Sequence, residues 1–300
     1  MIFRKLLLVL ALFLFGAGPA LAAGGVHHDP LPPYAEEIFH IGPFVVTNSM
    51  LMMWIVTAII VVFAQLATRK ATLIPAGLQN FAEWLIESLY DFLTGLMGKD
   101  LTKKTFWFFG GIFILILISN WAGLVPGVGT VGREVVNPND ATDQFRPFLR
   151  GGNADLNMTM AMSFTFAILW FYWAVKENGL KGFFEHIFAP KGTFAGVMKI
   201  IMLIVFFAVG VLEMVSIAFR PVALSFRLFG NVYAGETLLE KMQLLVPEWL
   251  GWLPPLPFYF LELLVGLIQA LVFTMLTAVF LKLICDHDHE HHDEEHSEAH

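Results

Sequence analysis

Ionisable and amide side chains occur within a stretch that is otherwise apolar enough to lie in a bilayer. Residues 213–236 read EMVSIAFRPVALSFRLFGNVYAGE and contain Glu213, Arg220, Arg227, Asn231 and Glu236. A mid-bilayer arginine costs roughly 2.5–3.5 kcal/mol on insertion scales, so such residues usually mark an ion or substrate path. The alternative is that the arginine head groups reach a membrane interface along their apolar stems. This alternative is weaker for Arg227, because apolar segments extend to both sides of it.

Most of these polar groups share one face if the stretch is helical. At about 100° per residue, four side chains fall within about 40° of Arg227: Glu213, Ser216, Arg220 and Asn231. Glu236 falls near the opposite face, at about 180°. A bend at Gly230 or Gly235 would change that position, or Glu236 faces a different neighbour.

Further polar groups occur in other apolar segments. Glu262 and Gln269 are seven residues apart and share a helical face, and Asp155 lies at the outer end of another segment. Several such groups on facing spans indicate a hydrated ion path. The alternative is a set of internal ion pairs, such as Arg227 with Glu262, that holds the bundle together. Buried pairs rarely gain net stability over apolar packing, so this alternative explains them poorly.

The composition is that of a polytopic membrane protein. Of the 300 residues, 57% are hydrophobic and 14% are charged, and the mean hydropathy is +0.69. The formal net charge of -7 arises in residues 286–300, which hold seven acidic residues and no lysine or arginine. No basic patch suggests nucleic-acid binding. The single Cys285 excludes an internal disulfide and a multi-cysteine metal site.

The fold class that we predict is an all-α polytopic membrane protein with about five membrane-embedded helical regions and one amphipathic surface helix. The five regions are Phe44–Thr68, Thr105–Val125, roughly Leu156–Val175, about Val197–Leu245 and Pro257–Cys285. A helix of the fourth region would reach roughly 65 Å, against a hydrocarbon thickness of about 30 Å. It must therefore tilt steeply, bend or break, and the last region is also long for one perpendicular span.

The remaining segments complete the predicted organisation. Residues 1–23 have the charged start, apolar run and small-residue cleavage site of a secretory signal peptide, with an uncleaved anchor as the alternative. Residues 24–285 form a single membrane domain whose mature N-terminus lies outside the cytoplasm. Its segment 76–98 alternates apolar and acidic faces at helical spacing and should lie flat at the cytoplasmic surface. Residues 126–153 show no periodicity and form an outer loop.

Histidine positions separate several function classes. Residues 286–300 form an acidic, His-rich cytoplasmic tail that we expect to be disordered, with loose zinc or nickel binding by His287, His289, His291 and His292 as the alternative. All ten histidines lie outside the predicted spans, which argues against a haem enzyme.

Other function classes are also disfavoured. The sequence contains no nucleophile–base set and no phosphate-binding loop, so nothing in it indicates an enzyme, and we expect no cofactor. A stand-alone secondary transporter or ion channel is the alternative, although repeated halves are not visible.

RLFGNVYAGE at 227–236 closely resembles the signature of subunit a of the F-type ATP synthase membrane sector, from which only Val232 departs. DLNMT at 155–159 resembles the third-span segment of that family, and LIQALVFTMLT at 267–277 resembles its last helix. The resemblance covers about residues 34–285. It implies a multi-pass protein of the bacterial plasma (inner) membrane that works with a c-subunit ring and b-type peripheral stalk subunits in a whole F1Fo complex.

The resemblance also implies a mechanism. Two laterally offset half-channels connect the carboxylates of the rotating ring to opposite sides of the membrane, and Arg227 separates them. Glu236, Glu262, Asn231 and Gln269 match the outer half-channel, Asp155 its mouth, and Glu213 and Ser216 the inner half-channel. Many bacterial members have histidine where this chain has Glu262, so two carboxylates would relay the ion here. Protons are the expected ion, with sodium as the alternative, and ATP chemistry belongs to partner subunits.

Overall fold

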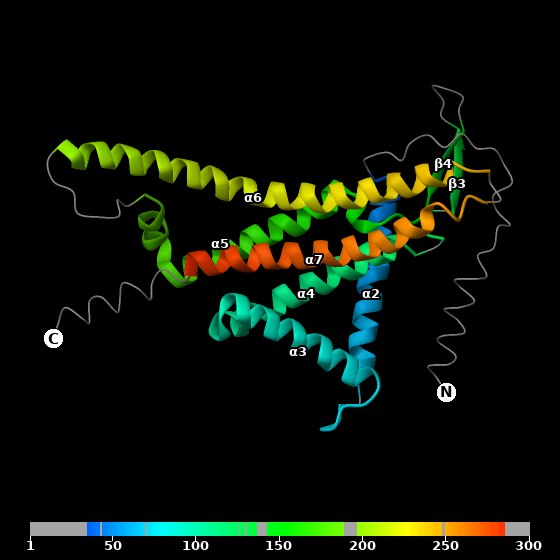
Figure 1. Cartoon of the computed structure of the whole chain (residues 1–300), viewed down its shortest axis with the longest axis horizontal. Helices are drawn as coiled ribbons and strands as arrows, with labels where there is room; N and C mark the ends of the chain where they lie inside the picture. Colours follow the sequence, from blue (N-terminus) through cyan, green and yellow to red (C-terminus); the bar gives the residue numbers. More distant parts are fainter. Residues whose placement is uncertain are drawn as a thin grey trace. The chain divides into compact units, whose positions relative to one another are not determined.

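The computed structural model describes residues 35–42, 44–69, 71–125, 127–129, 131–136, 143–188, 197–247 and 250–285 (Figure 1). The predicted signal peptide and the predicted His-rich tail lie outside the described residues. The chain divides into two compact units. Unit 1 comprises Met1–Arg69, Ile114–Met158 and Phe229–Ala270, and unit 2 comprises Lys70–Phe113, Thr159–Leu228 and Leu271–His300.

Long apolar helices dominate the described chain. They are α2 (Asn48–Thr68), α4 (Lys99–Gly123), α5 (Leu156–Phe188), α6 (Val197–Gln243) and α7 (Pro255–Cys285). Each contains a stretch that is long and apolar enough to cross a membrane. The predicted all-α polytopic fold with five membrane-embedded regions is thereby confirmed.

The first span begins later than we predicted. Phe44–Thr47 is strand β2, which pairs antiparallel with β1 (Glu37–Ile41), and α2 starts only at Asn48. The Oγ1 atom of Thr47 accepts a hydrogen bond from the backbone N–H of Met50 at 3.3 Å, which caps the first turn. The β-branched residues before the cap favour a strand, so their hydrophobicity alone misplaced the boundary.

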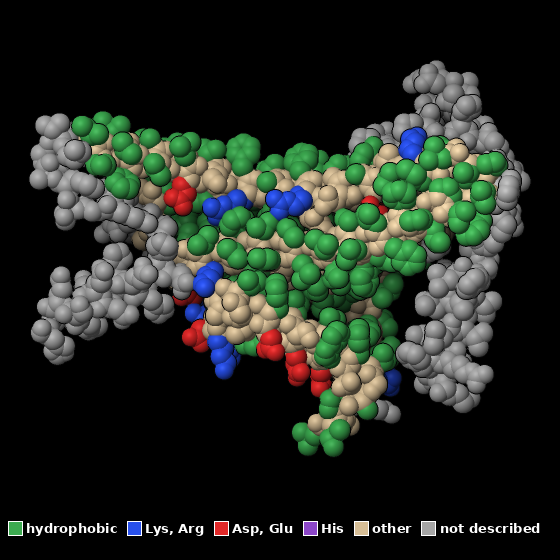
Figure 2. All heavy atoms as spheres, viewed as in Figure 1, with side chains coloured by type: hydrophobic (Ala, Val, Ile, Leu, Met, Phe, Trp, Pro, Cys, Tyr) green, Lys and Arg blue, Asp and Glu red, His purple; other side chains and the backbone are tan. Residues whose placement is uncertain are grey.

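The amphipathic helix is present as α3 (Leu78–Met97), close to the predicted 76–98. Leu89, Leu93 and Met97 are buried in unit 2, whereas Phe81 and Trp84 are more than half exposed. Acidic side chains follow the polar side of α3 in Figure 2. Burial of the exposed aromatic groups at a membrane surface would suit such a helix.

The segment that we predicted to be an outer loop is more ordered than its sequence suggested. Within residues 126–153, β3 (Gly132–Val136) and β4 (Asp143–Pro147) form an antiparallel hairpin, and a 3-10 turn, η1 (Gly152–Ala154), follows. The side chain of Asn48 donates a hydrogen bond to the carbonyl oxygen of Pro147 at 3.3 Å. Residues 150–155 are all buried, so this end of the loop is fixed within unit 1.

Helix α5 continues past the predicted end of the third span at Val175. The chain reaches Phe188 in helical form, but Gly179 adopts φ 70° and ψ 164°, which interrupts the helix. A side chain at this position would be strained, because L-residues rarely adopt a positive φ. The stretch suited to crossing the membrane therefore ends at Glu177.

Helix α6 accounts for the fourth predicted region as one element of 47 residues. Pro221 lies inside it, and the suggested bending points Gly230 and Gly235 stay helical. Its length of about 70 Å exceeds the hydrocarbon thickness more than twofold. Of the three solutions that we considered, a break is absent from the described helix, which leaves tilt or curvature.

Candidate functional site

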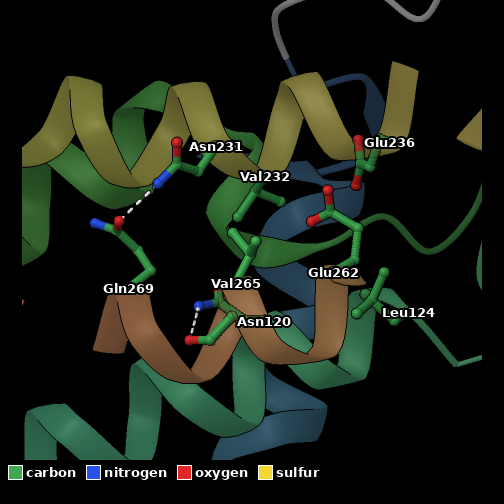
Figure 3. A pocket seen from close by; sticks show the side chains of 10 residues that line it. Asn120, Leu124, Asn231, Val232, Glu236, Glu262, Val265 and Gln269 are labelled. Atoms are coloured by element: carbon green, nitrogen blue, oxygen red, sulfur yellow. Dashed lines mark hydrogen bonds between the residues drawn. The ribbon is translucent and has the colours of Figure 1, made fainter. Parts of the chain in front are cut away.

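A small pocket in unit 1 collects polar groups from α4, α6 and α7 (Figure 3). Its lining comprises Asn120, Gly123, Leu124, Asn231, Val232, Glu236, Glu262, Val265, Gly266 and Gln269. The space available to the centre of a water molecule is ≈ 20 Å³, which suffices for one water. The four residues that the resemblance assigned to the outer half-channel therefore converge on one hydratable pocket.

Two amides form one side of the pocket. The Nδ2 atom of Asn231 donates a hydrogen bond to Oε1 of Gln269 at 2.6 Å. Only 4% of Gln269 is exposed, and its Nε2 atom has no hydrogen-bond partner within the described part of the chain. Buried amide N–H groups normally find a partner, so a water in the pocket is the natural acceptor for this one.

Glu236 forms the other side of the pocket. It is held by Arg150 and Gly151 of the outer segment (residues 150–155, at the end of the predicted outer loop). The Nε atom of Arg150 lies 3.2 Å from its Oε2, with the arginine side chain 4% and the glutamate side chain 16% exposed. The backbone of Gly151 also hydrogen-bonds the carboxylate. Helix α6 is unbroken in this region, and Glu236 faces Arg150 as its neighbour.

Glu262 approaches the pocket from α7. Figure 3 shows its carboxyl group pointing across the pocket towards Glu236. The carboxyl group lies against Gly235 of α6, in space that the Cβ of any larger residue would occupy. Among the described residues, no hydrogen bond or ion pair is made by this carboxyl group. The two carboxylates of the site are thus held very differently.

A buried asparagine pair supports this arrangement. The Nδ2 atom of Asn120 donates to the carbonyl oxygen of Gly266 at 3.1 Å, and its Oδ1 accepts from Nδ2 of Asn153 at 2.7 Å. The indole N–H of Trp121 donates to the carbonyl oxygen of Leu263 at 3.0 Å. These bonds fix α7 and the outer segment to α4. Residue types and spacing gave no indication of this role.

Asp155, which the resemblance assigned to the mouth of the outer half-channel, lies beside the start of α5. Its side chain is buried, and Oδ1 accepts a hydrogen bond from the backbone N–H of Asn157 at 3.0 Å at the start of α5. Burial raises the pKa of Asp155 above its ordinary value, opposed by the Asn157 hydrogen bond and by the charge of Arg150. The residue does not line the pocket; its contacts are those of a helix cap.

The remaining predicted residues belong to unit 2 and lie on α6. Ser216 and Arg227 are exposed, and Glu213 is half-buried. The guanidinium carbon of Arg220 lies 4.3 Å from the centre of the Phe280 ring, a cation–π contact. Within the described residues of unit 2, Arg227 makes no ion pair or hydrogen bond. The unit therefore presents these polar groups without collecting them into a closed site.

A sequence profile of the ATP synthase A chain family matches residues 50–282. The chain belongs to the ATP synthase A chain family. It is 30% identical to "ATP synthase subunit a" of Gloeobacter violaceus over 279 residues, which cover 90% of this chain and 99% of that relative. It is 29% identical over 245 residues to the protein of the same description from Moorella thermoacetica, with 82% and 94% covered.

A chloroplast relative extends the comparison beyond bacteria. "ATP synthase subunit a, chloroplastic" of Stigeoclonium helveticum is 31% identical over 233 residues, covering 77% of this chain and 82% of that relative. Membership in the ATP synthase A chain family confirms the resemblance that RLFGNVYAGE indicated. With the five apolar helices, it establishes a multi-pass membrane subunit.

Arg150 is the main residue that our sequence reasoning missed. Its position directly before a Gly-Gly step and five residues before Asp155, at the edge of a predicted span, was the available indication. Its partner Glu236 lies 86 residues away along the chain, and no local periodicity connects them.

Proposed function

We propose that this subunit carries protons across the membrane in an ATP synthase, through two half-channels that Arg227 separates. The observation that carries the proposal is the convergence of Asn231, Glu236, Glu262 and Gln269 on one hydratable pocket in unit 1. These groups come from apolar helices, where polar side chains are costly unless they serve an ion path or a partner. The family supplies the context of a rotary complex.

The pocket supplies what an outer half-channel requires. Glu236 and Glu262 can bind and release protons, and the Asn231–Gln269 pair offers neutral hydrogen-bonding groups beside them. One water between the carboxyl groups would complete a relay. Two carboxylates, rather than a carboxylate and a histidine, then pass the proton towards the ring.

Arg227 supplies the separation between the half-channels. Its charge is exposed and without an ion pair among the described residues of unit 2, so it is available to a carboxylate of the ring. A nearby positive charge favours the ionised form of a carboxylate, which promotes proton release from the ring. The same charge repels a free cation and blocks a direct leak, so protons cross only as the ring turns.

Glu213 and Ser216 complete the inner half-channel on the same helix in this proposal. The c-subunit ring and b-type stalk subunits are the direct partners, and ATP chemistry takes place in the soluble part of the complex. The mature N-terminus faces the outside of the bacterial plasma membrane and the tail faces the cytoplasm. A stand-alone transporter or channel, in contrast, would conduct ions when purified alone.

The test is ATP-driven proton pumping in inverted membrane vesicles, compared between the wild type and Arg227→Ala. We expect pumping to disappear while the complex still assembles, as judged by the subunits that copurify. Lys104→Gln is the control, because Lys104 pairs with Glu177 at an exposed position on α4, and it should retain the pumping. Intact pumping in Arg227→Ala would show that this arginine is structural and would refute the proposal.

A further inference from the structure

The outer segment contacts the Glu236 carboxylate of the pocket but makes no hydrogen bond or ion pair with the Glu262 carboxylate among the described residues. From this difference we propose that Arg150 is a positioning residue, which fixes Glu236 in the pocket wall so that Glu262 is the mobile proton carrier. The inference rests on the function proposed above and assigns separate roles to the two carboxylates. It also brings a residue outside the predicted spans into the proton path.

The contact between Arg150 and Glu236 is close and enclosed. The Nε–Oε2 distance is 3.2 Å, and the arginine side chain is 4% exposed. The guanidinium carbon also lies 6.0 Å from the centre of the Tyr233 ring, one turn before Glu236. Charge-assisted hydrogen bonds in such surroundings are among the stronger ones, so the carboxylate has little freedom to leave this place.

The backbone next to Arg150 contributes a second attachment. Gly151 hydrogen-bonds the Glu236 carboxylate, and a Cβ at Gly151 would lie 3.0 Å from Oε1. The absence of a side chain therefore lets the backbone approach the carboxylate closely. Asn153, two residues further on, bonds to Asn120 at 2.7 Å, and this bond keeps the segment itself in place.

Glu262 has the opposite character. Among the described residues its carboxyl group has no hydrogen-bonding or ionic partner, and the surface that it touches on α6 is Gly235. Its side chain is half-buried beside a pocket that can hold a water. A group that must accept a proton on one side and deliver it on the other needs this freedom.

The charges around Glu236 are compatible with this division of roles. Arg150 faces it from the outer segment, Glu262 faces it from α7, and Glu240 follows one turn later on α6. Asp155 also acts on Arg150 through its charge. Two facing carboxylates are difficult to ionise together unless a cation offsets one of them. Arg150 is the cation placed to do so.

The experiment compares pumping per assembled complex in Arg150→Met and Arg150→Lys with the wild type. The methionine keeps an unbranched stem but removes the charge and the donors, whereas the lysine keeps the charge. We expect Arg150→Met to lose at least about tenfold, since a misplacement of about 1 Å can cost up to 10²-fold. Arg150→Lys should recover at least about a third of the pumping, because charge alone still attracts the carboxylate.

A matched control removes a different ion pair. Lys104 Nζ lies 2.8 Å from Glu177 Oε1, but the two side chains are 59% and 35% exposed. Exposed pairs contribute little, so Lys104→Gln should pump like the wild type. Wild-type pumping in Arg150→Met, or a lysine variant as inactive as the methionine variant, would overturn the positioning role.

If the complex with Arg150→Met fails to assemble, assembly of the double variant Arg150→Met/Glu236→Leu tests the contact between the two residues. Removing one partner of a buried pair leaves an uncompensated charge, whereas removing both is often neutral for stability. Recovered assembly in the double variant supports the contact, and no recovery refutes it.

Arg227→Ala separates the two proposals. If it abolishes pumping while Arg150→Met pumps normally, the positioning role alone fails. If Arg227→Ala pumps normally, the half-channel mechanism fails.

Discussion

The polar groups of unit 1 and those of unit 2 occur on the same helix but have different surroundings. In unit 1, Asn231 and Glu236 of α6 are bonded to Gln269 and Arg150 at 2.6 and 3.2 Å. In unit 2, Ser216 and Arg227 of α6 make no hydrogen bond or ion pair among the described residues of that unit. The polar groups of the first set have bonding partners within this chain. Those of the second set remain available to another protein.

This difference indicates which function each set can perform. A closed set can bind a water and pass a proton between fixed groups without help from another protein. An open set of charges on an apolar helix would be costly in contact with lipid, so it calls for a partner that supplies the missing groups. Under the function proposed above, the relay would belong to unit 1 and the contact with the ring to unit 2.

The largest effect that would sharpen this comparison is expected from Glu236→Gln. The amide keeps the shape of the side chain but cannot bind and release a proton, and general acid–base groups typically contribute about 10²–10⁴-fold. Proton flow through the membrane sector, measured after removal of the soluble catalytic part, should fall by at least about 10²-fold. Flow close to the wild type would mean that the closed set is a structural cluster and not a relay.

A smaller effect is expected from Gly235→Ala, which places a methyl group in the space of the Glu262 carboxyl group. Since that carboxyl is the end of a flexible side chain, it can swing away at little cost in stability. Proton flow should nevertheless fall about three- to tenfold, because the carrier is displaced. The measurement is proton flow together with the thermal stability of the complex.

Gly230→Ala provides the control for this variant. It lies on the same helix, and nothing is within 4 Å of the Cβ that it would add. Both substitutions gain about 0.5–1 kcal/mol from replacing a helical glycine, so a difference between them reports the position of Glu262. Equal proton flow in the two variants would contradict the assigned place of this carboxyl group.

The smallest effect concerns Asp155, which the resemblance assigned to the mouth of the outer half-channel and whose side chain is buried. Its pKa is raised in the folded state, so its contribution to stability is complete below the pKa of the unfolded chain and declines as the pH rises through the folded pKa. Asp155→Asn retains a capping side chain and should be at least as stable as the wild type at neutral pH.

On acidification, the stability difference between Asp155→Asn and the wild type should shrink. Thermal unfolding of the purified complex at neutral and at acidic pH would measure it. A variant that is less stable than the wild type at neutral pH would indicate that the ionised carboxylate makes a favourable contact. Asp155 would then belong functionally with the charged groups of the pocket.

Local patterns were sufficient to predict much of this molecule. Apolar runs and their spacing predicted the five spans and α3. The polar residues in 213–236 and 262–269 include Asn231, Glu236, Glu262 and Gln269, which line the pocket, but also Glu213, Ser216 and Arg227, which do not. The start of α2 was misplaced because valines before the Thr47 cap are as hydrophobic as the helix itself. Hydropathy does not distinguish a short strand from the first turn of a span.

The contacts that hold the site together were beyond sequence reasoning. Arg150 reaches Glu236 across 86 residues, and Asn120 reaches Gly266 across 146. Such pairings depend on how helices pack, and neither residue belongs to a periodic pattern. The helical wheel predicted that Glu236 faces away from Arg227, and the tertiary structure identifies Arg150 as its contact.

The absence of a side chain at Gly235 has a consequence for how this family can vary. Because the backbone of α6 adds no side chain there, position 262 can accept groups of different size and chemistry without a change in the path of either helix. The carboxylate of this chain and an imidazole would then be alternative solutions within one scaffold. Substitutions at positions 235 and 262 should therefore be linked in evolution, with bulk at the first position restricting the proton carriers available at the second.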